Sequence, residues 1–156
     1  ALPIYAKVVF IGPCTAKKNE VLIESIKDSV DYVLTFEELF ALFDAFEINP
    51  SECEETTVDD GSIFGRGFAI GGGLTASIEN YISEKGIETE FKPVKVSGGS
   101  EIKKTMIMAK AGKLNGNFIE GMMCEGGCIN GAAKVVSSVK AKANCVKNNK
   151  EEKTRK

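Results

Sequence analysis

Short apolar runs alternate along the chain with segments of helical periodicity. Four runs rich in β-branched and aromatic residues have the pattern of strands and lie at 7–11, 32–35, 91–96 and 117–123. Helical spacing of apolar residues follows at 19–26, 35–46, 74–85, 100–110 and from about 129. This alternation predicts an α/β fold, a four-stranded, mainly parallel sheet flanked by helices on both faces.

Local signals place two of these helices more closely. Thr35 is followed three residues later by Glu38, which is the signature of a capping box and predicts a helix start. This helix is expected to end before Pro50 and to bury a largely aromatic stripe, which consists of Phe36, Leu39, Phe40, Phe43 and Phe46. In the last predicted helix an apolar stripe consists of Ala132, Val135, Val136, Val139, Ala143 and Val146.

The remaining segments are predicted to be loops or tails. The glycine-rich stretch 61–73, GSIFGRGFAIGGG, follows an acidic segment and predicts a long loop. One α/β domain is expected over 1–146, and the polar segment 147–156 is expected to be a C-terminal tail.

Charge and composition exclude several classes of function. The 20 Lys and Arg residues and 22 Asp and Glu residues leave a net charge of −2, without the basic excess that neutralises nucleic-acid phosphates. No apolar run reaches the length of a membrane span, and the first residues lack a signal-peptide pattern. We therefore expect a soluble, cytoplasmic chain with neither a nucleic-acid nor a membrane partner.

Cysteine and histidine usage narrows the possible chemistry. Five cysteines in a chain able to build a full core differ from the dense disulfide framework of small secreted proteins, and a reducing compartment fits better. Histidine is absent, which removes the commonest general base and any Cys–His nucleophile. Chemistry must therefore use thiolates, carboxylates, lysines or a bound cofactor.

Three of the cysteines are predicted to meet at one rim of the sheet. Cys14 follows the first strand, and Cys124 and Cys128 follow the fourth, at the carboxyl edge where ligands of such sheets bind. Gly126 and Gly127 let a bulky group approach the backbone. Single cysteines often only pack, but three at a glycine-lined rim favour an iron–sulfur or zinc site.

Two segments carry a resemblance to a known family. Residues 12–20, GPCTAKKNE, resemble the second signature of the [FeFe]-hydrogenases, which are iron-only hydrogenases. Residues 120–128, EGMMCEGGC, resemble the third signature. The order and separation of the two motifs also fit, and the resemblance covers nearly the whole chain as one lobe of the hydrogenase catalytic domain.

The resemblance implies an H-cluster, a [4Fe–4S] cube joined through one cysteine sulfur to a two-iron unit that carries carbon monoxide, cyanide and a dithiolate. By matching positions, Cys14 and Cys124 would ligate the cube, and Cys128 would bridge to the two-iron unit. The neighbouring residues expected to contact the cofactor are Pro13, Thr15, Gly126 and Gly127.

The same resemblance implies roles for three further side chains. Lys17 would hydrogen-bond a cyanide, Met122 would pack beside the two-iron unit, and Glu20 would lie on the proton path. Without the resemblance, Lys17 and Glu20 are equally explained as a solvated pair on a helix face. Met122 is then a core residue.

The chain also departs from the family pattern. The first signature, which supplies the fourth cube ligand, is absent, so we expect a fragment that lacks an N-terminal lobe, holds no complete cluster and is inactive by itself. Gly12 stands in place of a methionine, Glu125 in place of a proline, and Ala132 and Ala133 in place of glycines. These changes resemble a divergent, sensory-type branch of the family.

The leading functional hypothesis is an oxidoreductase that interconverts H₂ with protons and electrons. The family would add a ferredoxin-like electron carrier and hydrogenase maturation proteins as partners. Alternatives are an H₂-sensing protein of the same fold and a relative of the iron–sulfur assembly proteins. Lys17, Glu20 and Met122 argue against the assembly protein because they match the two-iron pocket. A zinc or purely structural cysteine site is the remaining possibility.

Overall fold

The computed structural model describes residues 5–56 and 62–151. The chain forms two compact units, Ala1–Val58 with Gly131–Val135, and Asp59–Asn130 with Val136–Lys156. Each unit contains one pair of parallel strands. The α/β class is confirmed, but the prediction of one four-stranded sheet is wrong, because the strands pair as β1–β2 and β3–β4.

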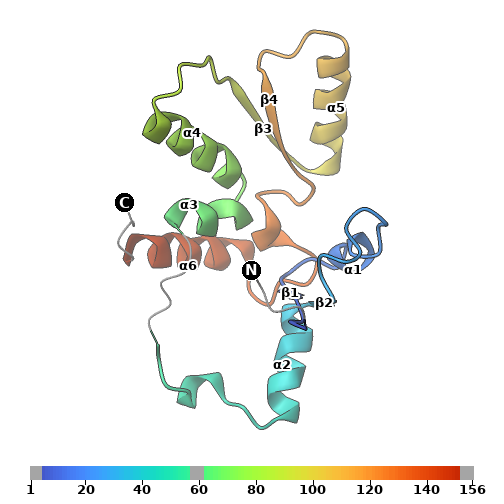
Figure 1. Ribbon diagram of the computed structural model, residues 1–156, viewed down its shortest axis with the longest axis vertical. Coiled ribbons are helices and arrows are strands. Elements are labelled where there is room, and N and C mark those ends of the chain that lie inside the picture. Colours follow the sequence, from blue (N-terminus) through green and yellow to red (C-terminus); the bar gives the residue numbers. More distant parts are fainter. Residues whose placement is uncertain (1–4, 57–61, 152–156) are drawn as a thin grey trace. The chain divides into compact units, whose positions relative to one another are not determined.

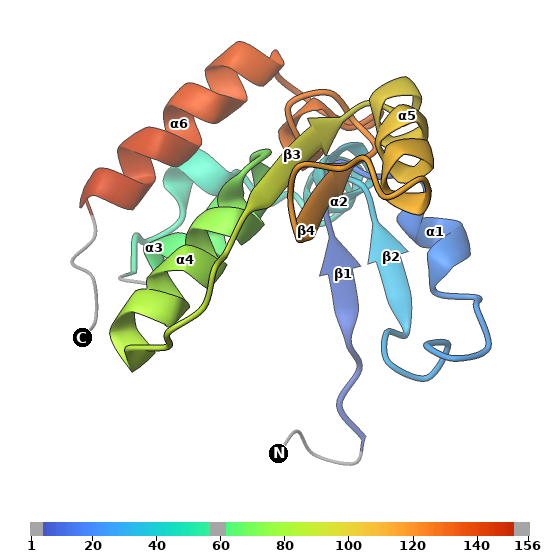
Figure 2. The same cartoon turned by 90° about the horizontal axis from the view of Figure 1, so that it is seen from above.

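The first unit is built on the β1–β2 pair, and Figure 2 shows the two strands side by side with α1 next to β2. Val9 pairs with Tyr32 and Ile11 with Leu34. The elements are β1 (Val9–Ile11), α1 (Lys17–Glu20), β2 (Tyr32–Leu34), α2 (Phe36–Ala45) and the 3₁₀ turn η1 (Pro50–Glu52). The helix predicted at 19–26 is thus reduced to the single turn α1, with further turns after it.

Asp31 fixes the start of this strand pair. Its carboxylate accepts a hydrogen bond from the Lys7 ammonium and another from the Val8 backbone N–H, each at 2.8 Å. The bond from Lys7 and then that from Val8 hold the pKa of Asp31 below its ordinary value of 3.8. At the other end, the Gly12 N–H donates to the Leu34 carbonyl at 3.1 Å. Hydrogen bonds therefore fix the backbone of the strand pair up to Gly12, two residues before Cys14.

The capping box at the start of α2 is confirmed. Thr35 Oγ1 accepts from the Glu38 N–H at 3.3 Å, and Glu38 Oε2 accepts from the Thr35 N–H at 2.8 Å. Lys18 also donates to Glu38 at 2.8 Å. This bond, followed by that of Thr35, lowers the pKa of Glu38 from 4.5.

The aromatic stripe of α2 is not buried as predicted. Phe40 is 47% exposed and Phe46 is 69% exposed, and no residue of the helix is buried. The reason is geometric, because two strands of three residues offer too little surface to cover ten residues of helix. The helix ends at Ala45, and Pro50 opens η1.

The second unit is built on the β3–β4 pair, and Figure 1 shows α4 and α5 on opposite sides of it. Pro93 pairs with Phe118 and Ser97 with Met122. The elements are α3 (Ile63–Arg66), η2 (Gly67–Ala69), α4 (Gly73–Lys85), β3 (Pro93–Ser97), α5 (Gly99–Lys110), β4 (Phe118–Met122), η3 (Cys128–Asn130) and α6 (Ser138–Glu151). Gly86 ends α4 in the left-handed conformation, as glycine after a helix commonly does.

Two predictions about this unit are wrong. The stretch 61–73 is not only a loop, because α3 forms behind the Ser62 N-cap, whose hydroxyl accepts from the Gly65 N–H at 3.1 Å. The last helix begins at Ser138 instead of near Ile129. Residues Gly131–Val135, which lie between these two positions, belong to the first unit. There the Ala133 N–H donates to the Pro13 carbonyl at 3.1 Å.

Only part of the predicted apolar stripe therefore lies on α6, namely Val139, Ala143 and Val146. Within the described ranges, no helix has the length and apolar character needed to cross a bilayer.

Replacing Thr35 by Ala should lower the free energy of unfolding by about 1 kcal/mol, because the Glu38 N–H loses its cap acceptor. Urea unfolding followed by circular dichroism measures this loss. Ser83→Ala, at an exposed helical position of α4, is the matched control and should change stability by less than about 0.5 kcal/mol. Equal losses in both variants would contradict the capping role.

Candidate functional site

The Cys124–Cys128 turn follows β4 after one intervening residue, Met123. The Gly127 N–H donates to the Cys124 carbonyl at 3.0 Å, and the turn passes through Gly126 at φ 80° and Gly127 at φ 104°. Both angles belong to the region that side chains disfavour. Cys124 is half-buried and Cys128 is exposed, and neither forms a disulfide. The turn thus presents two sulfurs on a backbone that depends on its glycines.

A second glycine segment packs against this turn by backbone alone. The Gly71 N–H donates to the Gly126 carbonyl at 3.0 Å. A Cβ at Gly127 would lie 2.6 Å from both the Ala69 carbonyl oxygen and the Gly71 nitrogen. No side chain fits at that distance. The glycines of 61–73 and of the cysteine turn therefore form one close contact, which we call the glycine contact.

A cavity of about 170 Å³ lies at the carboxyl ends of β3 and β4. Gly71, Lys95, Ser97, Met122 and Gly126 are among its lining residues. Ser97 Oγ accepts from the Gly126 N–H at 3.3 Å. Met122 and Gly126, both predicted from the sequence as site residues, are thus brought together here.

Glu120 is the residue of this site to which the sequence analysis assigned no role. It lies on β4, is only 2% exposed, and its carboxylate accepts from the Gly72 N–H at 2.7 Å and the Thr75 N–H at 2.9 Å. The Thr75 hydroxyl donates to the same carboxylate. Burial by itself raises the pKa of Glu120, but these hydrogen bonds outweigh it and hold the pKa below 4.5. The available signal was a carboxylate inside an otherwise apolar strand.

The other group of predicted residues lies in the first unit, in the loop after β1. Cys14 is a half-buried free thiol. Pro13 is half-buried, and its carbonyl accepts from the Ala133 N–H. Thr15 is exposed, and its carbonyl accepts from the Lys18 N–H at 3.2 Å at the start of α1.

Lys17 and Glu20 form an ion pair with an N–O distance of 2.5 Å. Their side chains are 37% and 42% exposed, which agrees with a solvated pair on a helix face. The same two residues line a cavity of about 130 Å³ whose other walls are apolar and consist of Phe10, Val21, Ile26 and Val30. The pair therefore borders both solvent and an apolar space.

Gly12, one of the departures from the family pattern, lies against the Phe10 ring. A Cβ at Gly12 would approach Phe10 Cε1 to 3.0 Å. A methionine at this position would require the ring to move. In this chain the aromatic ring thus takes the space that a longer side chain at residue 12 would enter.

The donor chemistry of the two groups suits part of an iron–sulfur site. Thiolates are the usual ligands of such clusters. The backbone has open space beside it at Gly126, whereas Gly127 is packed against residues 69–71 and does not have the open approach that the sequence predicted. Among residues 5–56 and 62–151, no three His, Cys, Asp or Glu side chains gather as a ready metal site. The remaining cysteines lie elsewhere, Cys53 exposed after η1 and Cys145 half-buried on α6.

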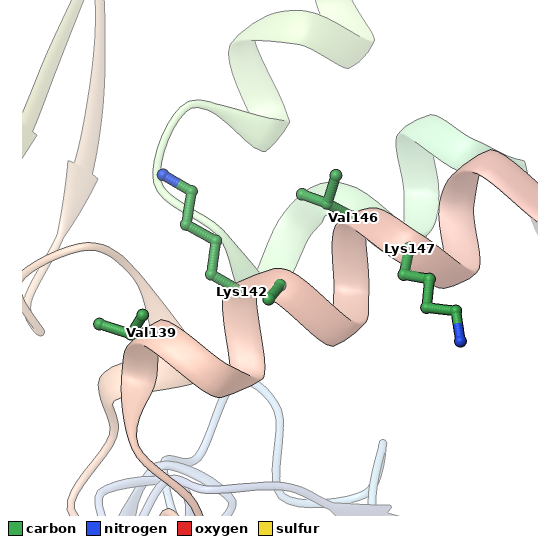
Figure 3. A pocket seen from close by; sticks show the side chains of 5 residues that line it. Val139, Lys142, Val146 and Lys147 are labelled. Atoms are coloured by element: carbon green, nitrogen blue, oxygen red, sulfur yellow. The ribbon is translucent and has the colours of Figure 1, made fainter.

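A groove of about 580 Å³ runs along α6 and contains none of the predicted site residues. Figure 3 shows Val139, Lys142 and Val146 projecting from one side of the helix. Ala143 and Lys147 complete its lining. Its chemistry is that of an apolar surface with a cationic rim.

Comparison with known proteins identifies relatives of the chain. The family model for the C-terminal domain of the iron-only hydrogenase large subunit matches residues 3–132. The structure of an [FeFe]-hydrogenase, solved in work on oxygen inactivation of its H cluster, aligns with 96% of this chain and 54% of its own, at a TM-score of 0.69 and 21% identity. A variant of the [FeFe]-hydrogenase HydA1 from Chlamydomonas reinhardtii aligns with 96% and 55%, at a TM-score of 0.67 and 20% identity.

A third structure, HydA(ΔEFG), described as revealing stepwise H-cluster assembly, covers 94% of this chain and 53% of its own, at a TM-score of 0.62 and 20% identity. At these identities the likeness shows the fold. The chain spans about half the length of these structures. Comparison with curated proteins gave no significant match.

Replacing Thr75 by Val should remove one of the donors to the Glu120 carboxylate and lower the free energy of unfolding at pH 7 by about 1.5 to 3 kcal/mol. The pKa of Glu120 is lowered by folding, so its stabilising effect is present above pH 4.5 and is lost as the pH falls through the folded pKa. The loss caused by Thr75→Val should therefore shrink in acid.

Urea unfolding between pH 3 and pH 7 measures this dependence. Thr105→Val is the matched control, a buried threonine on α5 with no carboxylate partner within the described part of the chain. A pH-independent loss in Thr75→Val, equal to that of the control, would contradict the role of Glu120.

Proposed function

The chain belongs to the family defined by the C-terminal domain of the iron-only hydrogenase large subunit, and from this premise we propose that it is part of an oxidoreductase that interconverts H₂ with protons and electrons at an H-cluster. Two observations support the proposal. The predicted ligand cysteines stand in two separate loops at strand ends. In the loop after β4 a Cβ at Gly126 would meet nothing within 4 Å, so the backbone between Cys124 and Cys128 has open space beside it.

The observation that carries the proposal is that the matching family model spans residues 3–132 and therefore includes both cysteine motifs, GPCTAKKNE and EGMMCEGGC. Cys14 stands in the first motif, and Cys124 and Cys128 stand in the second. We propose that Cys14 and Cys124 ligate a [4Fe–4S] cube and that Cys128 bridges it to a two-iron unit.

When bound, such a cluster supplies the irons at which electrons are exchanged and H₂ is formed or split. The chain's own residues bind and orient it. In the proposed site, Pro13 and Thr15 flank Cys14, and Gly126 and Gly127 lie between the other two cysteines in the sequence. Met122 lines the cavity at the carboxyl ends of β3 and β4. The half-exposed Lys17 ammonium is a strong donor towards an anionic ligand.

Glu20 would hold and release the proton at its carboxylate. Its ion pair with Lys17 at 2.5 Å keeps the two groups together at the edge of the apolar cavity beside Phe10. Exchange of Lys17 from Glu20 to a cluster ligand would leave that carboxylate available for a proton. The pair is thus a proposed acid–base unit rather than only a surface contact.

The whole activity requires more than this chain. The related structures are nearly twice as long, and we propose that a further N-terminal lobe supplies the remaining cube ligand. A ferredoxin-like electron carrier and maturation proteins complete the proposed set of partners. Five cysteines in a chain able to build a full core support the proposed reducing, cytoplasmic location, and the proposed anaerobic setting rests on the family.

A sensor of H₂ with the same fold is the second candidate, and the packing at Gly12 favours it. The Phe10 ring occupies the space next to residue 12, where catalytic relatives would place a longer side chain. Glu125 in the cysteine turn adds a carboxylate where the family pattern has a proline. An iron–sulfur assembly protein is less well supported, because Lys17, Glu20 and Met122 would then have no ligand to serve.

Cys53 and Cys145 should be dispensable for iron binding, because one is exposed after η1 and the other lies on α6. In the chain co-expressed with its complementary lobe and the maturation proteins, Cys53→Ala with Cys145→Ala should leave the iron content unchanged. Cys14→Ala, Cys124→Ala and Cys128→Ala should each reduce it severely. Iron and sulfide analysis measures this, and iron loss only in the first variant would identify other ligands.

The chain by itself should not hold a complete cluster, because three thiolates leave one corner of a cube without a ligand. Anaerobic reconstitution with iron and sulfide should give less than a stoichiometric [4Fe–4S] EPR signal and no H₂ uptake. Addition of the complementary lobe should raise both. A stoichiometric signal with turnover from the 156 residues alone would show that the chain is self-sufficient.

A further inference from the structure

We infer that Glu120 is a positioning residue that sets the place of the Cys124–Cys128 turn through the glycine contact. The inference rests on the proposed role of these two cysteines as cluster ligands. Glu120 opens the second of the two motifs, EGMMCEGGC, and the proposed function gives it no task. Its contacts supply one.

The first step is that Glu120 accepts hydrogen bonds from the backbone at the start of α4. One carboxylate oxygen accepts from the Gly72 N–H at 2.7 Å, and the other accepts from the Thr75 N–H at 2.9 Å. Gly72 is the N-cap of α4 and has no side chain to cap it. A carboxylate from another element therefore satisfies the free N–H groups of this helix end, where negative charge is favoured.

The second step is the link from the segment before α4 to the cysteine turn. Gly71 and Gly72 are neighbours, and while the Gly72 N–H binds Glu120, the Gly71 N–H binds the Gly126 carbonyl at 3.0 Å. Two successive N–H groups thus bridge the carboxylate and the turn. A shift of Gly72 would carry Gly71 with it, and the bond from the Gly71 N–H to the Gly126 carbonyl would transmit that shift to the turn.

The third step separates this role from general support of the fold. The β3–β4 ladder runs from Pro93–Phe118 to Ser97–Met122, and the Gly98 N–H extends it to the Met122 carbonyl at 2.9 Å. These backbone bonds do not involve the Glu120 carboxylate. Loss of its charge should therefore loosen Gly71, Gly72 and the cysteine turn while the strand pair remains closed.

The charge itself is required, and not only the shape of the side chain. A glutamine has one acceptor oxygen in place of two, and its NH₂ group would face an N–H donor of α4. Glu120→Gln should therefore break at least one of the bonds to Gly72 and Thr75. Glu125→Gln is the matched control, because Glu125 lies in the same motif and is exposed.

The experiment uses the full chain in which Cys14, Cys53 and Cys145 are replaced by Ser, so that Cys124 and Cys128 are the remaining thiols. Amide hydrogen exchange by NMR compares Glu120→Gln with Glu125→Gln. Exchange at Gly71, Gly72 and Gly127 should accelerate about tenfold or more in Glu120→Gln alone. The amides of the β3–β4 ladder should retain their protection.

Titration with Co²⁺ gives a second measurement, the affinity of the two thiolates for the ion. If Glu120 only supported the fold, this affinity would not change while the β3–β4 ladder remains protected. The thiolate-to-cobalt absorption should saturate at a Co²⁺ concentration about tenfold higher in Glu120→Gln than in Glu125→Gln, because the two sulfurs lose their relative position. Thr75→Val, which keeps the carboxylate, should give a smaller shift in the same direction. It serves as the test variant if Glu120→Gln does not fold.

Unchanged exchange and unchanged Co²⁺ affinity in Glu120→Gln would overturn the inference. Equal acceleration at the ladder amides would also overturn it, because Glu120 would then only support the fold. Neither measurement involves iron. Failure of the parent chain to take up iron with its complementary lobe would therefore count against the proposed function and leave the positioning role standing.

Discussion

A buried carboxylate at the start of a helix is the interaction on which the second unit depends. Moving a charge out of water is costly unless hydrogen bonds replace its hydration. For Glu120, the N-terminal backbone of α4 supplies those bonds. The carboxylate in turn caps a helix that begins at Gly73 and whose N-cap, Gly72, has no side chain. The helix end thus replaces the hydration of the carboxylate, and the carboxylate satisfies N–H groups of the helix end. The same arrangement brings β4, the start of α4 and the cysteine turn into one cluster of backbone contacts.

The sequence predicted best those features that are decided by neighbouring residues. The capping box of Thr35 and Glu38, the stop at Gly86 and the four strands all follow from residues a few positions apart. Strand pairing does not, because it joins residues more than twenty positions apart, and the chain formed two pairs instead of one sheet. The start of the last helix was also missed. Helical spacing continues through Ala132 and Val135, but the bond of Ala133 to Pro13 holds that segment in the first unit.

For the candidate site, residue types were easier to predict than contacts. The cysteines and glycines of both motifs lie at strand ends, as expected for an α/β fold. The i, i+3 spacing of Lys17 and Glu20 predicts a pair on one helix face, and the ion pair is present. The role of Glu120 could not be read from its own motif. Its partners Gly72 and Thr75 lie 48 and 45 residues earlier, and no local pattern links them.

The glycine contact has a consequence for how this protein can change over evolutionary time. At Gly86 and Gly112 a side chain would meet open space, so only the strain of a positive φ disfavours a substitution there. At Gly127 a side chain would run into the main chain of residues 69–71, and at Gly73 it would run into the Gly67 carbonyl. A clash with main-chain atoms cannot be relieved by replacing a neighbouring side chain with a smaller one. These positions are therefore closed to single amino-acid replacement, and the spacing of residues between them is closed to insertion and deletion as well.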